Sequence, residues 1–367
     1  SAGGTAYGIY ATGGEAGASV TNSGNIEVQG GYVTGIEVQS SGDLVVDNSG
    51  GIVAGSGLNS YYNGSNYYTY YFGTQVATGI NATSNGEGAA VSVSNSGDIS
   101  ADGIFGATGI AATASGYGGS ASVTNSGAIY ASQNQKYGYG AYGIVVSSDG
   151  DGSIDNSGSI EVYSGGVANG ATVLSFAGDA SVTNSGDISA YSAAAGYYGA
   201  TGITAFAANG SAYVGNSGSV SVTSAAIAGA ATRAVDAQGQ QGVVVVNSGS
   251  LYANGKYAYG VYALSTAGDV AVHNEDGGEI GFYSYSGTGF GVLGISYLGD
   301  VDVDNAGSIE GYAYGQSVGV FGFSGDGDVS VHNSGSISAV TGGNAAVGVF
   351  ARADYGTASV SNSGDIY

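Results

Sequence analysis

A short phrase recurs along the whole chain: a valine or isoleucine, any residue, an asparagine, usually Ser-Gly, and an isoleucine shortly afterwards. It first appears at residues 20–26 as Val-Thr-Asn-Ser-Gly-Asn-Ile. Successive asparagines lie 26 to 47 residues apart, and most spacings are close to 30. The asparagines of the twelve copies are Asn22, Asn48, Asn95, Asn125, Asn156, Asn184, Asn216, Asn247, Asn274, Asn305, Asn333 and Asn362. A period of this length, kept from end to end, predicts a repeat architecture.

Within one copy the sequence alternates over short spans that are bounded by Gly and Asp. In the copy of Asn184 these spans are residues 170–173, 180–184 and 188–190, with Gly178-Asp179 between the first two. Alternation with a period of two, interrupted by turn residues, is typical of β-strands. We therefore predict three short strands per copy.

The copies align into columns of similar residues. Two positions before the asparagine there is Val in eleven copies and Ile154 in the twelfth, and Ile, Val or Leu follows four positions after it in all but the Asn274 copy. Many copies also begin with a Gly-Ile or Gly-Val pair. One copy cannot bury its own apolar side, whereas stacked copies share a continuous core. The predicted fold is all-β: a parallel β-helix (β-solenoid) of about twelve coils of roughly 30 residues, right-handed by the usual crossover rule.

The columns run without interruption, so we expect residues 1–367 to form a single continuous solenoid with a Tyr-rich loop insertion at about residues 57–77. Asparagines stacked in one column predict a ladder of side-chain amide hydrogen bonds. We also expect the Gly two positions after each asparagine to adopt a backbone conformation that only glycine tolerates. This corner is therefore predicted to be scaffold, with function in the variable loops.

Composition excludes several classes of protein. Gly contributes 73 of 367 residues, but it has no three-residue period, which excludes collagen. The 27 acidic residues outnumber the 4 basic ones, so binding to nucleic acid or to an anionic membrane surface is not expected. There is no Cys for a disulfide or thiolate metal site, and no apolar run long enough to insert in a membrane as a helix.

Tyrosine and glycine are concentrated between the third strand of one copy and the first strand of the next, and we predict that these segments are loops. The tyrosines assigned to them are Tyr137, Tyr139, Tyr142, Tyr191, Tyr197, Tyr198, Tyr257, Tyr259, Tyr283, Tyr285, Tyr312 and Tyr314. The candidate binding loop within the long insertion contains Tyr61, Tyr62, Tyr67, Tyr68, Tyr70, Tyr71 and Phe72. Such rings suit contacts with sugars or proteins. The alternative is that they fold back and shield the small residues of the coil.

Catalytic and metal-binding patterns are weak. The basic residues Lys136, Arg233, Lys256 and Arg352 lie outside any carboxylate cluster, which argues against a polysaccharide lyase or hydrolase. His273 and His332 share one column, directly before the asparagine, where a solvent-facing turn is expected.

A second column, five positions before the asparagine, is acidic and fits a Gly-Asp turn. Its aspartates are Asp43, Asp151, Asp179, Asp269, Asp300 and Asp328. We predict no cofactor. The densest acidic clusters, which are the best candidates for Ca²⁺, contain Asp149, Asp151, Asp326 and Asp328, without an EF-hand or nonapeptide pattern.

The phrase Gly-Asp-x-x-Val-x-Asn-Ser/Ala-Gly-x-Ile, as at residues 178–188 and 299–309, resembles the repeats of bacterial autotransporter passengers and related secreted β-solenoid adhesins. The resemblance covers all twelve copies. It implies an extracellular location at the bacterial cell surface and a role in adhesion, biofilm or surface coating. We therefore expect a non-enzymatic structural or adhesive protein; the alternative is a polysaccharide-active enzyme on a β-helix.

Expected partners are the protein itself, end to end or laterally, and glycans or proteins of another cell surface. A chain continued from Tyr367 to Ser1 would keep its asparagines 27 residues apart, so the two ends are in phase. This favours either a window of a longer solenoid or a subunit that stacks into a fibre.

Overall fold

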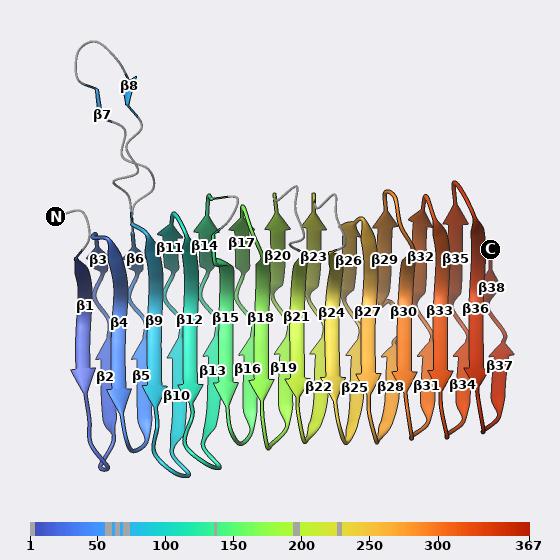
Figure 1. Cartoon of the computed structure of the whole chain (residues 1–367), viewed down its shortest axis with the longest axis horizontal. Helices are drawn as coiled ribbons and strands as arrows, with labels where there is room; N and C mark the ends of the chain where they lie inside the picture. The colour runs from blue at the N-terminus through green and yellow to red at the C-terminus, as the bar shows by residue number, and fades with distance from the viewer. Residues whose placement is uncertain are drawn as a thin grey trace.

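The computed structural model describes residues 4–55, 61–62, 67–68, 74–135, 138–193, 199–225 and 230–367. Three parallel sheets of twelve strands each form a β-solenoid, as predicted, and each coil contributes one strand to every sheet (Figure 1). Within these ranges no helix is long and apolar enough to cross a membrane.

We call the three sheets the first, second and third sheet, after the order in which one coil passes through them. The strands of the first sheet are β1 (Thr5–Thr12), β4 (Tyr32–Ser40), β9 (Val76–Ser84), β12 (Gly106–Ala114), β15 (Gly140–Ser148), β18 (Ala168–Ser175), β21 (Ala200–Ala207), β24 (Ala231–Gly239), β27 (Tyr257–Ser265), β30 (Gly289–Ser296), β33 (Gln316–Ser324) and β36 (Ala345–Ala353). The strands of the second sheet are β2 (Ala18–Asn22), β5 (Leu44–Asn48), β10 (Ala90–Asn95), β13 (Ser120–Asn125), β16 (Gly152–Asn156), β19 (Ala180–Asn184), β22 (Ser211–Asn216), β25 (Gly242–Asn247), β28 (Asp269–Asn274), β31 (Val301–Asn305), β34 (Val329–Asn333) and β37 (Ala358–Asn362).

The strands of the third sheet are β3 (Ile26–Val28), β6 (Ile52–Ala54), β11 (Ile99–Gly103), β14 (Ile129–Gln133), β17 (Ile160–Ser164), β20 (Asp187–Ser192), β23 (Ser219–Ser224), β26 (Ser250–Gly255), β29 (Glu279–Ser284), β32 (Ser308–Ala313), β35 (Ser336–Thr341) and β38 (Asp365–Ile366). Two further strands, β7 (Tyr61–Tyr62) and β8 (Tyr67–Tyr68), pair antiparallel within the long insertion. They belong to the insertion predicted at about residues 57–77, of which residues 74–77 are also described; the last two of these already belong to β9.

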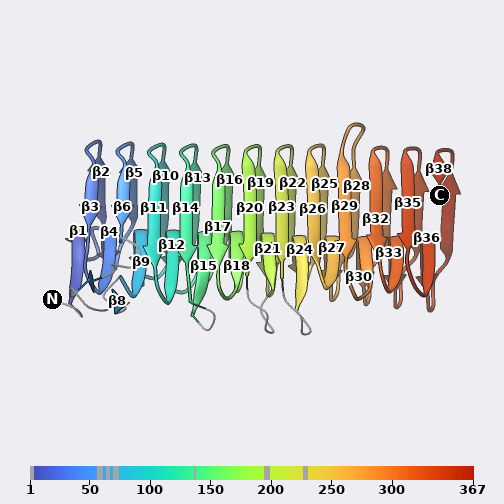
Figure 2. The same cartoon turned by 90° about the horizontal axis from the view of Figure 1, so that it is seen from above.

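The path of one coil explains the shape of the molecule. The chain runs down the first sheet and returns through the second and third sheets while it advances toward the C-terminus, which makes the coil right-handed (Figures 1 and 2). The first sheet lies along one side, and the corner between the second and third sheets lies opposite it (Figure 2). The strands of the first sheet are generally the longest, because each spans the full width that two strands share on the other side.

The register stacks like residues on like residues. In the second sheet Val182 pairs with Ile154 on one side and Val214 on the other, and in the third sheet Ile188 pairs with Ile160 and Val220. These six side chains are at most 1% exposed. A slip by one residue would turn every buried column to the surface, so the hydrophobic pattern fixes the register.

A glycine column explains the recurrent Gly-Ile pairs. A Cβ added to Gly109 in the first sheet would overlap Cγ2 of Ile129 in the third sheet, and Gly260 has the same relation to Ile280. The side chains of the third strand therefore fill the space above the glycine. One coil departs from the pattern: Ala234 replaces the glycine, and Leu251 stands in the isoleucine column.

Candidate functional site

The predicted asparagine column forms a continuous hydrogen-bonded ladder at the corner between the second and third sheets. Asn184 is 2% exposed; its Nδ2 donates to Oδ1 of Asn216 at 2.9 Å and to the carbonyl oxygen of Gly186 at 2.9 Å. Its own Oδ1 accepts from Nδ2 of Asn156 at 2.8 Å. Eleven such amide-to-amide bonds join the twelve asparagines. Hydrogen-bonded buried amides of this kind stabilise the corner.

The role predicted for the glycine in this corner is wrong. The described glycines with positive φ are Gly17, Gly55, Gly88, Gly118, Gly140, Gly242 and Gly277, and none lies two positions after a ladder asparagine. Glycine is needed there for another reason: a Cβ on Gly186 would overlap the carbonyl oxygen of Gly158 in the preceding coil. The glycine allows close approach of two backbones and does not provide an unusual angle.

The acidic column connects neighbouring coils. A carboxylate oxygen of Asp179 accepts the backbone N–H of Ser211 at 2.8 Å, and Asp300 accepts that of Asp328 at 2.7 Å. Of the Ca²⁺ candidates, Asp151 and Asp328 belong to this column and accept the N–H groups of Asp179 and Thr357.

The other two Ca²⁺ candidates lie beside this column. Asp149 accepts the N–H of Gly118 at 2.7 Å, and Asp326 is exposed. Among the residues with described positions, no group of three or more His, Cys, Asp or Glu could hold a metal ion. The column acts as a set of acceptors for backbone amides of the next coil.

The histidines lie on the second sheet, at the ends of strands and not in turns. Nδ1 of His273 is 3.1 Å from Oδ2 of Asp304 in the next strand, and Asp304 pairs in turn with His332. The pKa of the neighbouring Asp302 is raised, first by burial and then by the Asp304 carboxylate, while the two histidines oppose this shift. The contact between His273 and Asp304 is at the surface, and side-chain pairs in such positions contribute little to stability.

Several tyrosines that were expected in loops lie in strands, so that part of the prediction is wrong. Tyr142 is in β15, Tyr191 in β20, Tyr257 and Tyr259 in β27, Tyr283 in β29 and Tyr312 in β32. Tyr142, Tyr191, Tyr259 and Tyr283 each lie between two buried neighbours, and alternation along the strand turns these rings outward. Parallel register then stacks rings from adjacent coils: Tyr163 on Tyr191 with centroids 5.3 Å apart, and Tyr283 on Tyr312 at 5.7 Å.

The remaining tyrosines divide into two groups. Tyr139 precedes β15 and is 78% exposed, while Tyr285 and Tyr314 directly follow β29 and β32. The backbones of Tyr61, Tyr62, Tyr67 and Tyr68 form β7 and β8, but their side chains lie outside the described residues. Tyr70, Tyr71, Phe72, Lys136, Tyr137, Tyr197 and Tyr198 also lie outside the described residues.

An apolar face covers the outer side of the first sheet over β27, β30, β33 and β36. We define the apolar face as the outward residues Tyr259, Tyr262, Leu264, Phe290, Leu293, Ile295, Phe321, Phe323, Val347 and Phe350. Arg352 lies at its C-terminal edge, over the ring of Phe323. Tyr259 stacks on Phe290 at 5.4 Å, Phe290 meets Phe321 edge to face at 6.1 Å, and Phe321 stacks on Phe350 at 5.0 Å. Four rings thus form an unbroken row along the solenoid axis.

A charged pair on β24 marks the border of the apolar face. The Arg233 guanidinium lies 4.8 Å from the centroid of Tyr262 and 5.4 Å from that of Tyr259, and its Nη1 is 3.4 Å from Oδ2 of Asp236. Burial raises the pKa of Asp236, while Arg233 and a 2.7 Å hydrogen bond from Gln238 lower it. On the other side of this pair, the outward positions of β9 and β12 are mostly threonine, with Asn81 and Ala111 between them. The same sheet is therefore mostly polar over β9 and β12 and apolar in its C-terminal part.

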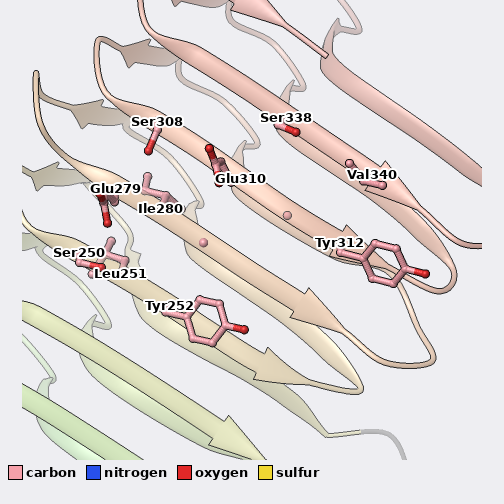
Figure 3. A pocket seen from close by; sticks show the side chains of 12 residues that line it. Ser250, Leu251, Tyr252, Glu279, Ile280, Ser308, Glu310, Tyr312, Ser338 and Val340 are labelled. Carbon is pink, nitrogen blue, oxygen red and sulfur yellow. The ribbon is translucent and has the colours of Figure 1, made fainter.

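A hollow of about 550 Å³ lies on the outer side of the third sheet, over β26, β29, β32 and β35 (Figure 3). We call it the third-sheet hollow. Its prominent side chains are Tyr252, Glu279, Glu310 and Tyr312. Its outward position on β29 is a glycine, Gly281, and the missing side chain there opens the surface.

Comparisons of the chain with models of protein families, with curated proteins and with solved structures found no match. The function therefore has to be argued from the geometry of the outer faces.

Proposed function

We propose that the protein is a non-enzymatic structural and adhesive component of a bacterial cell surface, and that its apolar face makes the adhesive contact. One observation carries this proposal: a row of stacked aromatic rings, flanked by aliphatic side chains, on the outer face of the first sheet. Contiguous exposed apolar surface of this kind marks sites of protein–protein contact. The extracellular location rests on the resemblance of the repeat phrase to secreted solenoid adhesins.

Charge supports the assignment of this surface. The chain carries a formal net charge of −23, which opposes association of two copies over most of their surface. The outward positions that form the apolar face contain no acidic residue, and the nearest acid on the preceding strand, Asp236, is paired with Arg233. Electrostatic repulsion is therefore weakest at the apolar face. Two copies can meet there side by side, or the face can contact an apolar surface of another protein.

The scaffold suits this role because it is long and held in register. Every coil is hydrogen-bonded to the next through three strands and the asparagine ladder, and six of the coils also through an aspartate of the acidic column. Rings on such a sheet are already ordered before contact, which lowers the entropic cost of binding.

The test is a bead-clumping assay with the purified chain coupled to beads. The double variant Phe321→Asp/Phe350→Asp places two carboxylates in the row of rings and should abolish clumping. The matched control, Thr78→Asp/Thr108→Asp, adds the same charge to the polar part of the same sheet and should clump like the wild type. Equal clumping by both variants would refute the apolar face as the contact. End-to-end stacking uses backbone strand edges instead, so filaments seen by electron microscopy in both variants would separate that mode of assembly from lateral contact.

A further inference from the structure

We propose that the third-sheet hollow binds a short saccharide that carries no acidic group. The hollow is on a different sheet from the apolar face, so this inference goes beyond the proposed adhesive contact and does not depend on it. Four features of the hollow support a sugar ligand: its opening, its rings, its carboxylates and its hydroxyls.

The opening is produced by glycine at one outward register position. In β29, Gly281 pairs with Tyr252 on one side and Glu310 on the other, so a side chain is missing between two large ones. Gly311 in β32 has a different role, because a Cβ there would overlap the inward ring of Phe282, which is 2% exposed. The backbone at Gly281 lines a floor between Tyr252 and Glu310 that a ligand can approach.

Two aromatic rings flank this floor and are held in position. Tyr252 lies across Gly281, where an added Cβ would be 2.8 Å from its Cδ2 atom, and Tyr312 is stacked on Tyr283 at 5.7 Å. The rings stand on strands two apart, which is roughly 10 Å along the axis. Tyrosine offers an apolar ring and a hydroxyl together, and sugars present apolar ring faces bordered by hydroxyls. The spacing of the rings suits a disaccharide or a trisaccharide.

The polar groups of the hollow favour a ligand with hydroxyl donors. Glu279 and Glu310 are exposed, and among the described residues neither carboxylate has a hydrogen bond or ion pair. Ionised carboxylates are strong acceptors for hydroxyl groups. The lining also contains the hydroxyls of Ser250, Ser308 and Ser338 but no Lys, Arg or His. An acidic sugar would meet two like charges without a compensating base, so the chemistry selects against uronic acids and sulfated sugars.

The experiment is a binding assay with defined probes on the intact chain: cellotriose, maltotriose and chitotriose as uncharged sugars, trigalacturonate as the acidic comparison and triglucosamine as the cationic one. Binding is followed by NMR line broadening of the probe and quantified by calorimetry. We expect at least one uncharged probe to bind and trigalacturonate not to bind. Tyr252→Ala and Glu310→Gln should each weaken that binding about tenfold, because each removes one of the few groups that contact the ligand.

The matched control is Tyr163→Ala, which removes an outward tyrosine from the same sheet at a position outside the hollow. It should bind like the wild type, and circular dichroism of all variants checks that the solenoid is intact. Failure of every uncharged probe to bind, equal loss in Tyr163→Ala, or binding confined to triglucosamine would each overturn the proposal. Release of shorter sugars from a bound probe would also overturn it, in favour of an enzyme. None of these results bears on bead clumping through the apolar face.

Discussion

Replacing Leu251 by isoleucine should destabilise the solenoid, although both side chains contain the same atoms. In the other coils, the β-branched side chain of the third strand places a methyl group in the space above a glycine of the first strand. The eighth coil has Ala234 at the glycine position, and its methyl group already lies in that space. Leu251 branches one carbon further out, and an isoleucine there would bring a second methyl group to the same place.

The size of the effect follows from the neighbouring coils. At Gly109 an added Cβ would overlap Ile129 and would also lie 2.5 Å from the carbonyl oxygen of Gly143, so neither partner has room to spare. Forcing an extra methyl group into a well-packed core costs about 1–3 kcal/mol. Ala234→Gly in the same chain should restore most of this loss, although alone it should cost about 0.5–1 kcal/mol through added backbone freedom. The coupling energy of the two substitutions should therefore be about 1–3 kcal/mol.

The assay has to report on one coil, because a long repeat protein does not unfold in a single step. Hydrogen exchange of the amides of β24 and β26 measures the free energy of local opening there. The matched control is Ile280→Leu beside Gly260, which makes the reverse exchange where a glycine leaves room and should cost less than about 1.5 kcal/mol. The reasoning is refuted if Leu251→Ile costs no more than the control, or if Ala234→Gly fails to rescue it.

Two further predictions concern polar groups. Asn184→Leu removes three hydrogen bonds at a buried corner and should lower the local free energy of unfolding by about 3 kcal/mol or more. The same change at the exposed Asn362 should cost about 1 kcal/mol. Equal losses for the two variants, measured by hydrogen exchange, would contradict a stabilising role of the buried ladder. The pKa of Asp236 is raised above its ordinary value of 3.8, so the folded state binds this proton more tightly than the unfolded state. The stabilisation that this proton gives to the folded state is present below pH 3.8 and is lost as pH rises through the raised pKa. Asp236→Asn should therefore remove this decrease of the unfolding free energy with pH from denaturation curves measured across that range. An unchanged pH dependence in the variant would contradict the prediction.

The fold could be predicted because three columns of the repeat each carry one physical requirement. Asparagine marks the corner, isoleucine fills the space beside it, and glycine leaves room for that isoleucine, as Gly109 does for Ile129. The columns give the register of all three sheets at once, since parallel stacking places each residue beside its counterpart. The spacing of the repeats does not show which backbone amide donates to which carboxylate. The hydrogen bond from the Ser211 N–H to Asp179 is therefore seen only in the structure.

The location of the tyrosines is harder to predict, because segments rich in Tyr and Gly are typical of loops and yet form strands in this solenoid. Tyr142 follows Ala141 and precedes Gly143-Ile144, which is the outward position of an alternating strand. The same alternation would have placed Tyr259 on the apolar face. The third-sheet hollow forms because Gly281 has no side chain. It could not be predicted from the sequence, because it also depends on which residues of the adjacent coils lie beside Gly281.

The asparagine ladder has a direction. In every one of its bonds the amide nitrogen belongs to the earlier coil and the oxygen to the later one. The amide dipoles therefore add along the axis, and each bond polarises the next. A coil can join this row only head to tail, because an inverted coil would set oxygen against oxygen or nitrogen against nitrogen. The asparagine ladder thus favours head-to-tail addition of a further coil over inverted addition, in addition to any preference of the backbone strands.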